Sequence, residues 1–181
     1  MENQYDYSRL KKCGIDTYIS SHVEIRRPEL FSIGSHSAVD TGFYTTEVEL
    51  GDYLHISPYV SVIGGAKGLF RMGHFTTLSS GARIICGSDK MLGHGLVGPM
   101  IPDEFKDEIV TKPVVMEQFS SVGTNAVIFP GVTIAEGSVV GANSLVTSST
   151  EPWTIYYGSP ARPIKARFKD NMLLYAKKLG Y

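Results

Sequence analysis

The stretch from Met116 to Thr147 repeats with a period of six residues. An apolar side chain opens each unit, at Met116, Val122, Ile128, Ile134, Val140 and Val146. The fifth place is small or β-branched throughout, with Ser120, Ala126, Val132, Ser138 and Ser144. A short fixed period with an apolar anchor is typical of a β-helix, in which each repeat forms one flat side of a coil. The repeat therefore predicts an all-β, parallel β-helix whose anchors stack into interior rows.

The same register occurs in shorter pieces upstream, where further units open at Ile33, Leu50, Ile56, Met72, Leu78 and Ile84. Three sides of six residues make a coil of about 18 residues. We therefore expect five or six coils in a helical body over residues 15–147, followed by a closing segment at 148–181. The length of 181 residues suits one domain, residues 1–181. The 19 glycines would serve the corners, because glycine adopts positive φ easily.

The hexad pattern is absent for 24 residues, 89–112. A loop of this length inside a compact repeat body is typical of a lid or a binding arm. Its apolar residues stand among charged ones and require a surface to cover, for which we expect a neighbouring subunit; they are Leu96, Val97, Met100, Ile101 and Phe105. A floppy insertion is the alternative.

After Thr147 the hexads end. Beyond Pro163 apolar residues step by threes and fours, at Ile164, Phe168, Met172, Tyr175 and Leu179. This spacing predicts a short amphipathic C-terminal α-helix. We expect that helix to cap the open end of the coil stack.

Composition excludes several classes of function. The net charge of -1 leaves no basic excess for binding nucleic acid or a membrane surface. No run of about 18 apolar residues is present, so we expect no membrane insertion. The polar N-terminus does not resemble a signal peptide. Two cysteines, Cys13 and Cys86, are too few for a disulfide framework or a metal site, and we expect reduced thiols in a cytoplasmic protein.

The hexads, the long loop and the closing motif Gly158-Ser-Pro-Ala-Arg-Pro-Ile-Lys165 together resemble the left-handed β-helix (hexapeptide-repeat) acyltransferases. The resemblance extends from about Ile33 to Lys165. It implies coils of left-handed winding, an exception to the right-handed crossover rule. It also implies a homotrimer with active sites in the clefts between subunits, and acetyl-CoA as the acyl donor.

The resemblance also implies cofactor-binding positions. Small residues along the last coils would line the groove for the pantetheine arm: Gly123, Thr124, Ala142, Thr147 and Ser148. Arg162 and Lys165 in the closing motif would contact the cofactor phosphates, which cationic donors suit. The family often has a lysine where Ser148 stands. Without the resemblance, these small residues would be ordinary corners of a β-helix.

Asp89 stands where sugar O-acetyltransferases of this family carry a histidine that serves as general base. A sugar hydroxyl benefits from a base that titrates near neutral pH, and a carboxylate is a weak base there. A carboxylate can nevertheless orient an amine, which requires less help. Asp89 as the catalytic residue therefore favours an amine acceptor over a hydroxyl acceptor.

The segment from Gly73 to Asp89 is also similar to enzymes that N-acylate nucleotide-linked amino sugars for surface polysaccharides such as O-antigen. The sequence thus predicts an acetyl-CoA-dependent N-acetyltransferase acting on a nucleotide-linked deoxyamino sugar. Substrate-binding candidates near the loop are His74, Ser88, Lys90 and His94. A sugar O-acetyltransferase with His74 or His94 as base is the first alternative, and a non-catalytic β-helix scaffold is the second.

Three histidines, His36, His55 and His74, are spaced nineteen apart, close to one coil. They occupy the fourth, sixth and third places of their hexads, so we expect them not to point the same way. The related γ-type carbonic anhydrases hold zinc with three histidines, two of them close in sequence, and this chain has no such close pair. We therefore predict no metal site.

Overall fold

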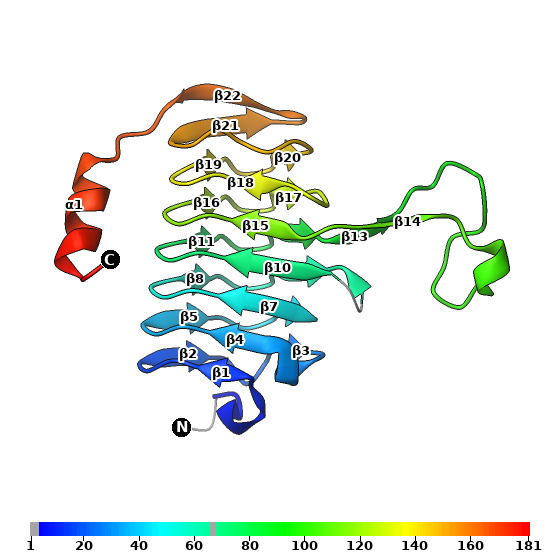
Figure 1. Cartoon of the computed structure of the whole chain (residues 1–181), viewed down its shortest axis with the longest axis horizontal. Coiled ribbons are helices and arrows are strands. Elements are labelled where there is room, and N and C mark those ends of the chain that lie inside the picture. The colour runs from blue at the N-terminus through cyan, green and yellow to red at the C-terminus, as the bar shows by residue number, and fades with distance from the viewer. Residues whose placement is uncertain (1–3, 66–67) are drawn as a thin grey trace.

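The computed structural model describes residues 4–65 and 68–181, which form a triangular prism of stacked coils (Figure 1). Each side of the prism is a sheet of parallel strands, except at the top of one side. Face 1 contains β1 (Lys12–Cys13), β4 (Phe31–Ile33), β7 (Glu47–Leu50), β10 (Leu69–Met72), β15 (Val114–Met116) and β18 (Thr133–Ile134). Face 2 contains β2 (Thr17–Ile19), β5 (Ser37–Val39), β8 (His55–Ile56), β11 (Thr77–Leu78), β16 (Ser121–Val122), β19 (Val139–Val140), β21 (Thr154–Gly158) and β22 (Ala161–Ala166). At the top of this face, β22 pairs antiparallel with β21. Face 3 contains β3 (Glu24–Ile25), β6 (Tyr44–Thr45), β9 (Ser61–Ile63), β12 (Arg83–Ile85), β17 (Val127–Ile128) and β20 (Leu145–Val146).

The hexad anchors form the interior rows that the period predicts. On face 2 the register aligns Ile56 with Leu78, Leu78 with Val122, and Val122 with Val140. All of these side chains are at most 1% exposed. The small fifth places are buried as well, from Ser120 to Ser144. The predicted left-handed β-helix is confirmed, with six coils and the pair β21–β22 above them on face 2.

The corners differ from the expectation that glycine provides them. The fourth place of each complete hexad has positive φ, with values of 62° at Phe119, 55° at Asn125, 80° at Gly131, 64° at Gly137 and 56° at Asn143. Only two of these five residues are glycines. Asparagine tolerates a single left-handed position, and the ring of Phe119 is stacked on that of Phe75. The expectation for the glycines was therefore wrong in part.

Aromatic rings stack along the corner between faces 1 and 2, here called the 1–2 corner. Ring centroids of Tyr53 and Phe75 are 5.1 Å apart, and those of Phe75 and Phe119 are 5.2 Å apart. Trp153 continues the stack at 5.8 Å from Phe119. Gly137 leaves the space for that indole, since a Cβ there would lie 2.3 Å from Trp153 Cε3. Stacked rings at this spacing stabilise the corner.

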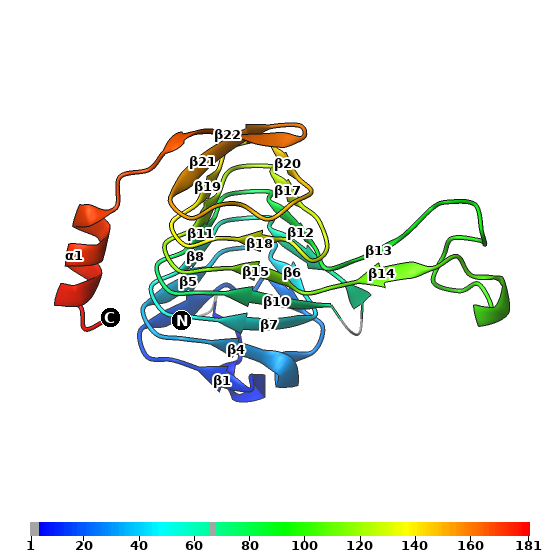
Figure 2. The same ribbon diagram turned by 45° about the horizontal axis from the view of Figure 1, so that its top comes forward.

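The predicted loop is an ordered arm that projects from the corner between faces 3 and 1, the 3–1 corner (Figures 1 and 2). Its base is an antiparallel hairpin of β13 (Gly87–Asp89) and β14 (Ile109–Thr111). Farther out, the buried carboxylate of Asp107 accepts hydrogen bonds from the backbone N–H groups of Leu92 (3.1 Å) and Glu108 (2.8 Å). Short 3-10 helices occur in the arm and in the first coils, at Asp103–Phe105, Tyr7–Arg9 and Pro28–Leu30. The internal pairing argues against a floppy insertion.

The C-terminal helix is shorter than predicted and does not cap the coil stack. Residues that the spacing assigned to its start belong to β22, because this segment pairs with β21 and Pro163 disfavours a helix interior. Helix α1 (Asp170–Lys178) instead lies beside the prism, and the chain returns toward the lower coils (Figure 1). Arg167 anchors the connection by donating to the carbonyls of Phe119 (2.7 Å) and Gly137 (3.0 Å).

Candidate functional site

Asp89 lies at the base of the arm, where β13 leaves the 3–1 corner. Its side chain is half-buried, and within residues 4–65 and 68–181 no group donates a hydrogen bond to its carboxylate. It borders an open hollow of about 660 Å³, lined by Gly64, Gly65, Gly87, Ser88, Asp89, Ile109 and Thr111. The arrangement leaves a carboxylate able to accept hydrogen bonds from a group that enters the hollow.

Two other predicted substrate-binding residues near Asp89 have partners within the arm. The hydroxyl of Ser88 donates to the carbonyl of Asp89 at 3.2 Å. Lys90 forms an ion pair with Glu108, and this hydrogen bond lowers the pKa of the Glu108 carboxyl. His94 lies farther out and is exposed. Lys90 would have to leave Glu108 in order to bind a substrate phosphate or carboxylate.

The arm also presents an apolar surface. Its large exposed side chains are Met91, Leu92, Leu96, Val97, Met100, Phe105 and Ile109. Such a patch on a projecting segment marks a surface suited to an interaction. The sequence-based expectation that the arm covers a neighbouring subunit stays a prediction.

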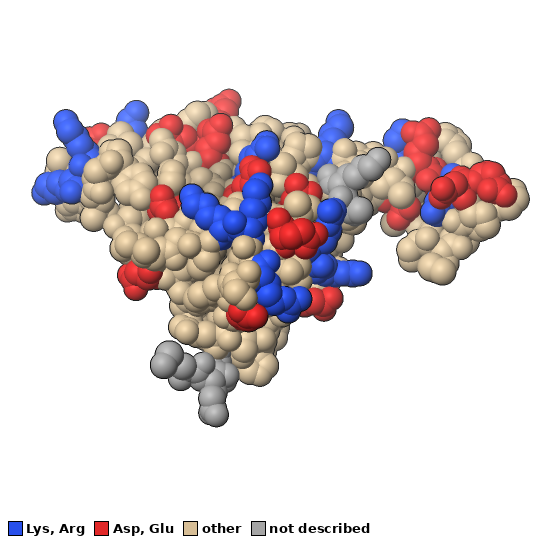
Figure 3. Space-filling view, turned by 60° about the horizontal axis from the view of Figure 1, so that its bottom comes forward, with Lys and Arg blue, Asp and Glu red and all other residues tan. Residues whose placement is uncertain are grey.

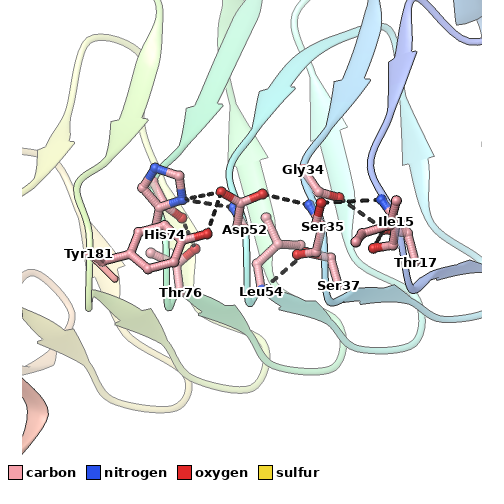
Figure 4. Close-up of polar contacts among 11 residues, drawn as sticks. Ile15, Thr17, Gly34, Ser35, Ser37, Asp52, Leu54, His74, Thr76 and Tyr181 are labelled. Carbon is pink, nitrogen blue, oxygen red and sulfur yellow. Dashed lines mark hydrogen bonds and ion pairs between the residues drawn. The ribbon is translucent and has the colours of Figure 1, made fainter. Parts of the chain in front are cut away.

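His74 lies at the 1–2 corner, so the structure does not bring it together with Asp89 in one chain. The backbone N–H of Asp52 donates to His74 Nδ1 at 2.9 Å, and Asp52 Oδ2 is 3.0 Å from the same nitrogen. Because the first contact requires an unprotonated Nδ1 and the second a protonated one, this nitrogen is engaged in either state. Tyr181 packs on the imidazole at 4.9 Å between ring centroids (Figure 4).

The predicted cofactor-binding residues occupy three separate places. Gly123, Thr124 and Ala142 stack at the corner between faces 2 and 3, the 2–3 corner, where a Cβ on Gly123 would lie 2.6 Å from the Ala142 nitrogen. Arg162 and Lys165 are exposed on β22 at the top of face 2. Thr147 and Ser148 follow β20 and begin the 3–1 corner. The structure thus places Gly123, Thr124 and Ala142 together beneath Arg162 and Lys165. Thr147 and Ser148 lie apart from both of these groups.

A strip of small residues descends from the two cations along the outer edge of face 2. Residues paired in register form its first column, and residues at the 2–3 corner form its second. The small-residue strip consists of Val139, Ser121 and Thr77 in the first column and Gly141, Gly123 and Ser79 in the second. Lys165 stands above the first column through its pairing with Ile155, and Ile155 in turn pairs with Val139.

A histidine–aspartate pair lies directly below the small-residue strip, and sequence reasoning missed it. His55 is the register partner of Thr77, and its Nε2 lies 2.8 Å from Asp40 Oδ2. Both side chains are partly exposed, at 47% for His55 and 32% for Asp40. The missed signal was the register itself, because His55 occupies the same outward place in its coil as Thr77 and Ser121 in theirs.

One ion pair joins neighbouring strands of face 1. Arg71 Nε contacts Glu49 Oε2 at 2.6 Å. In the view of Figure 3, cationic and anionic side chains are interspersed.

Among the described residues, no cluster of three or more histidine, cysteine, aspartate or glutamate side chains is arranged to hold a metal ion. Within these described residues, no helix, α1 included, is long and apolar enough to cross a membrane.

A β-helix of hexapeptide repeats with a projecting arm and a closing strand pair defines the class of this protein, and comparisons with known proteins refine it. No protein-family model matches the chain. The dTDP-4-amino-4,6-dideoxy-D-glucose acyltransferase of Escherichia coli is 29% identical over 163 residues, which are 88% of this chain and 83% of that protein. A probable macrolide acetyltransferase of Lysinibacillus sphaericus is 35% identical over 138 residues, or 73% of this chain and 70% of that protein.

Solved structures agree with these relatives. The N-acyltransferase AntD from Bacillus cereus, crystallised as an aspartate-to-alanine variant with dTDP and coenzyme A, superposes with a TM-score of 0.91. It is 32% identical, and the match covers 99% of each chain. A hexapeptide-repeat acetyltransferase from Vibrio cholerae, 20% identical with a TM-score of 0.58, shares the fold. The chain therefore belongs to the left-handed β-helix acyltransferase family and is an acyltransferase.

Proposed function

We propose that this enzyme is an acetyl-CoA-dependent N-acetyltransferase that acts on the amino group of a nucleotide-linked deoxyamino sugar in the biosynthesis of O-antigen or another surface polysaccharide. One observation carries the proposal. A variant of the B. cereus N-acyltransferase holds dTDP-4-amino-4,6-dideoxyglucose and coenzyme A, and it matches 97% of this chain with 31% identity and a TM-score of 0.90.

Asp89 would accept a hydrogen bond from the acceptor amine and orient it toward the thioester. In the B. cereus relative, the aspartate and the serine replaced in the crystallised variants are ten positions apart. Asp89 has a serine at the same separation, Ser79, which belongs to the small-residue strip. This spacing supports Asp89 as the functional carboxylate and adds Ser79, which the sequence patterns did not single out.

The acyl donor would lie along the small-residue strip, with its phosphates at Arg162 and Lys165. A flat strip of small side chains admits a thin chain against the backbone, and exposed cationic donors suit phosphate oxygens. Gly123, Thr124 and Ala142 fit this role directly. Thr147 and Ser148, at the other end of face 3, would belong to the same donor site only if a second copy brought that edge close.

The separation of these elements supports a homotrimer. Asp89 and the small-residue strip lie at opposite edges of face 3, so one chain cannot present both to a single substrate. A cyclic assembly can place the arm of one copy against face 2 of the next. The exposed apolar side chains of the arm supply a surface for that contact.

An O-acetyltransferase is the second candidate, favoured by a different relative. The putative lipopolysaccharide biosynthesis O-acetyl transferase WbbJ of E. coli is 31% identical over 125 residues, which are 68% of this chain and 59% of that protein. In that case His94, the exposed histidine of the arm, would provide the base. The carboxylate at Asp89 and the wider match to the N-acyltransferase favour the amine acceptor.

Release of coenzyme A thiol tests the proposal. Purified protein with acetyl-CoA should release thiol in the presence of dTDP-4-amino-4,6-dideoxyglucose and not with the 4-hydroxy sugar. Because the B. cereus enzyme was crystallised with 3-hydroxybutyryl-CoA, that donor should be compared with acetyl-CoA. Asp89→Asn should lower kcat about 100-fold, whereas Asp103→Asn, an exposed aspartate of the arm, should not. Transfer to the hydroxy sugar alone would contradict an amine acceptor, and failure to bind coenzyme A in calorimetry would favour the scaffold.

A further inference from the structure

The pair His55–Asp40 is the first group below the small-residue strip that can take up a proton. The strip itself carries only Thr, Ser, Val and Gly side chains. Strands of this face are about 4.8 Å apart, so a donor whose phosphates lie at β22 extends downward past β21, β19, β16 and β11 toward β8. The thioester is at the far end of such a donor. His55 on β8 therefore stands where the reacting carbonyl would arrive.

The contact with Asp40 determines which nitrogen of His55 is available. Asp40 Oδ2 is 2.8 Å from Nε2, so the neutral imidazole carries its hydrogen on Nε2 and donates it to the carboxylate. Nδ1 is then unprotonated, and within the described part of the chain it has no hydrogen-bond partner. The cross-strand neighbours Ala38 and Thr77 carry no charge. This arrangement resembles the orientation of a catalytic histidine by a carboxylate.

We infer that His55 is the general base of the acyl transfer, that Asp40 positions it, and that it acts together with Asp89 of a neighbouring copy. The inference rests on the proposed function. The amine nitrogen attacks the thioester carbonyl carbon, forming the C–N bond of a tetrahedral intermediate. His55 Nδ1 takes one proton from the positively charged nitrogen while Asp89 accepts a hydrogen bond from the other N–H. The C–S bond then breaks, and the proton passes from the imidazole to the departing thiolate.

The two residues must come from different copies, because the whole of face 3 lies between them in one chain. His55 points outward from face 2, whereas Asp89 borders the hollow at the 3–1 corner. Each complete site would therefore join the arm of one subunit to face 2 of the next. A trimer of this kind contains three such sites.

A pair of histidine variants tests the base. His55→Gln should lower kcat about 100-fold or more without changing the Kd for coenzyme A, and Asp40→Asn should lower kcat roughly 10-fold. The matched control is His36→Gln, since His36 forms a similar pair with Asp16 (3.0 Å) at the 1–2 corner. Its kcat should remain within about twofold. A normal kcat in His55→Gln, or a change in KM alone, would overturn the inference.

The pH profile separates a base from a structural residue. Protonation of the acceptor amine and protonation of the general base each block the reaction, so log(kcat/KM) of the wild-type enzyme should fall toward acidic pH with a limiting slope of two. His55→Gln should fall with a slope of one. An unchanged slope of two in the variant would assign the second proton to another group and overturn the role of His55.

Co-expression of His55→Gln with Asp89→Asn tests the shared site. Random trimers of the two inactive chains contain one intact site in each mixed assembly, so about a quarter of wild-type activity should return. No recovery would show that the residues do not act across subunits. The proposed function is judged separately by the wild-type protein: if it releases no thiol with the amino sugar, both proposals fall, whereas an active wild type with an equally active His55→Gln variant removes only the general base.

Discussion

The hydroxyl of Tyr181 donates a hydrogen bond to Asp52 Oδ2 at 2.9 Å, joining positions 129 apart in sequence. The Tyr181 ring also packs edge-on against Phe75, with centroids 5.0 Å apart. With the Arg167 contacts, this arrangement fastens α1 to the 1–2 corner at both ends. Only Ala176 of the helix itself is buried. The position of α1 therefore depends on a few contacts beyond its own ends.

Tyr181→Ala should release α1 while leaving the coils intact. Hydrogen–deuterium exchange of residues 170–178 should increase about tenfold, corresponding to the loss of roughly 1.4 kcal/mol from a hydrogen bond and its ring contacts. The thermal midpoint of the β-helix should change little. Tyr175→Ala is the control, because that ring is 58% exposed. Unchanged exchange in α1 would show that Arg167 alone positions the helix.

The hydrogen bond between Tyr181 and Asp52 should weaken at both low and high pH. Burial alone would raise the pKa of Asp52, but hydrogen bonds from the Ser35 N–H and Tyr181 and the nearby His74 lower it below 3.8. Its contribution is thus present above about pH 4 and is lost as the pH falls through the lowered value. The hydrogen bond to Asp52 raises the pKa of Tyr181 above 10.0. The contact is therefore also lost as the pH rises through this raised pKa.

Exchange of α1 measured from pH 3 to pH 11, after correction for intrinsic rates, should therefore show a broad protected range with two edges. Asp52→Asn should remove the acidic edge. An acidic edge that persists in this variant would assign it to another carboxylate.

The two thiols should differ in reactivity. Burial raises the pKa of the Cys86 thiol to about 11, and this side chain is fully buried. Cys13 is half-buried, and burial raises its pKa as well. At pH 8 a disulfide reagent should modify one thiol slowly in the native protein and two in denaturant, since the thiolate is the reactive form. Cys13→Ser should abolish the native reaction, and two native thiols would contradict the burial of Cys86.

Gly137→Ala should destabilise the β-helix strongly. The residue has φ of 64°, and its new Cβ would lie 2.3 Å from Trp153 Cε3. Backbone strain and the displaced indole together should cost about 3 kcal/mol in chemical denaturation. Gly131→Ala is the matched control at the same hexad place, because its Cβ would meet only the flexible Lys112 side chain. Equal costs would show that strain alone is responsible.

Removal of both cations of the closing motif should weaken binding of the donor. Arg162→Ala combined with Lys165→Ala should raise the Kd for coenzyme A about tenfold or more, since hydrogen bonds between charged groups are the stronger ones. The loss should be smaller for dephospho-coenzyme A, which lacks one phosphate group. Lys169→Ala serves as the control for general charge. Calorimetric titration measures all three, and an unaffected Kd would move the phosphate site elsewhere.

Much of the fold follows from periodicity, because an anchor such as Val122 must face inward in every coil to keep its row dry. The arm was also predictable, since it interrupts the period. The corners were less so: Asn125 and Gly137 adopt the same backbone conformation, and only tertiary packing against Trp153 demands a glycine at the second. The start of α1 was misplaced because apolar steps beyond Pro163 satisfy helical spacing although that segment pairs with β21.

The parts of the candidate site that local sequence determines could be predicted. The parts that depend on which residues pair across neighbouring strands could not. Asp89 stands at the point where the repeat stops, which local sequence reveals. His55 lies on β8 and Asp40 directly follows β5, 15 positions earlier, and the pairing of these two strands brings the side chains together. Period counting predicted different directions for His36, His55 and His74, whereas the structure places His36 and His74 at the same 1–2 corner, each with its own aspartate partner. It could not show what His55 faces.

The number of strands of face 2 between β22 and β8 determines the distance between the cations of the closing motif and His55. Each coil adds one strand spacing, about 4.8 Å, between the cations of the closing motif and the imidazole below the strip. Inserting or deleting one coil there would shift these two points by a fixed step without disturbing either of them. In the proposed donor site, the number of coils would set how long the acyl donor must be for its thioester to reach His55.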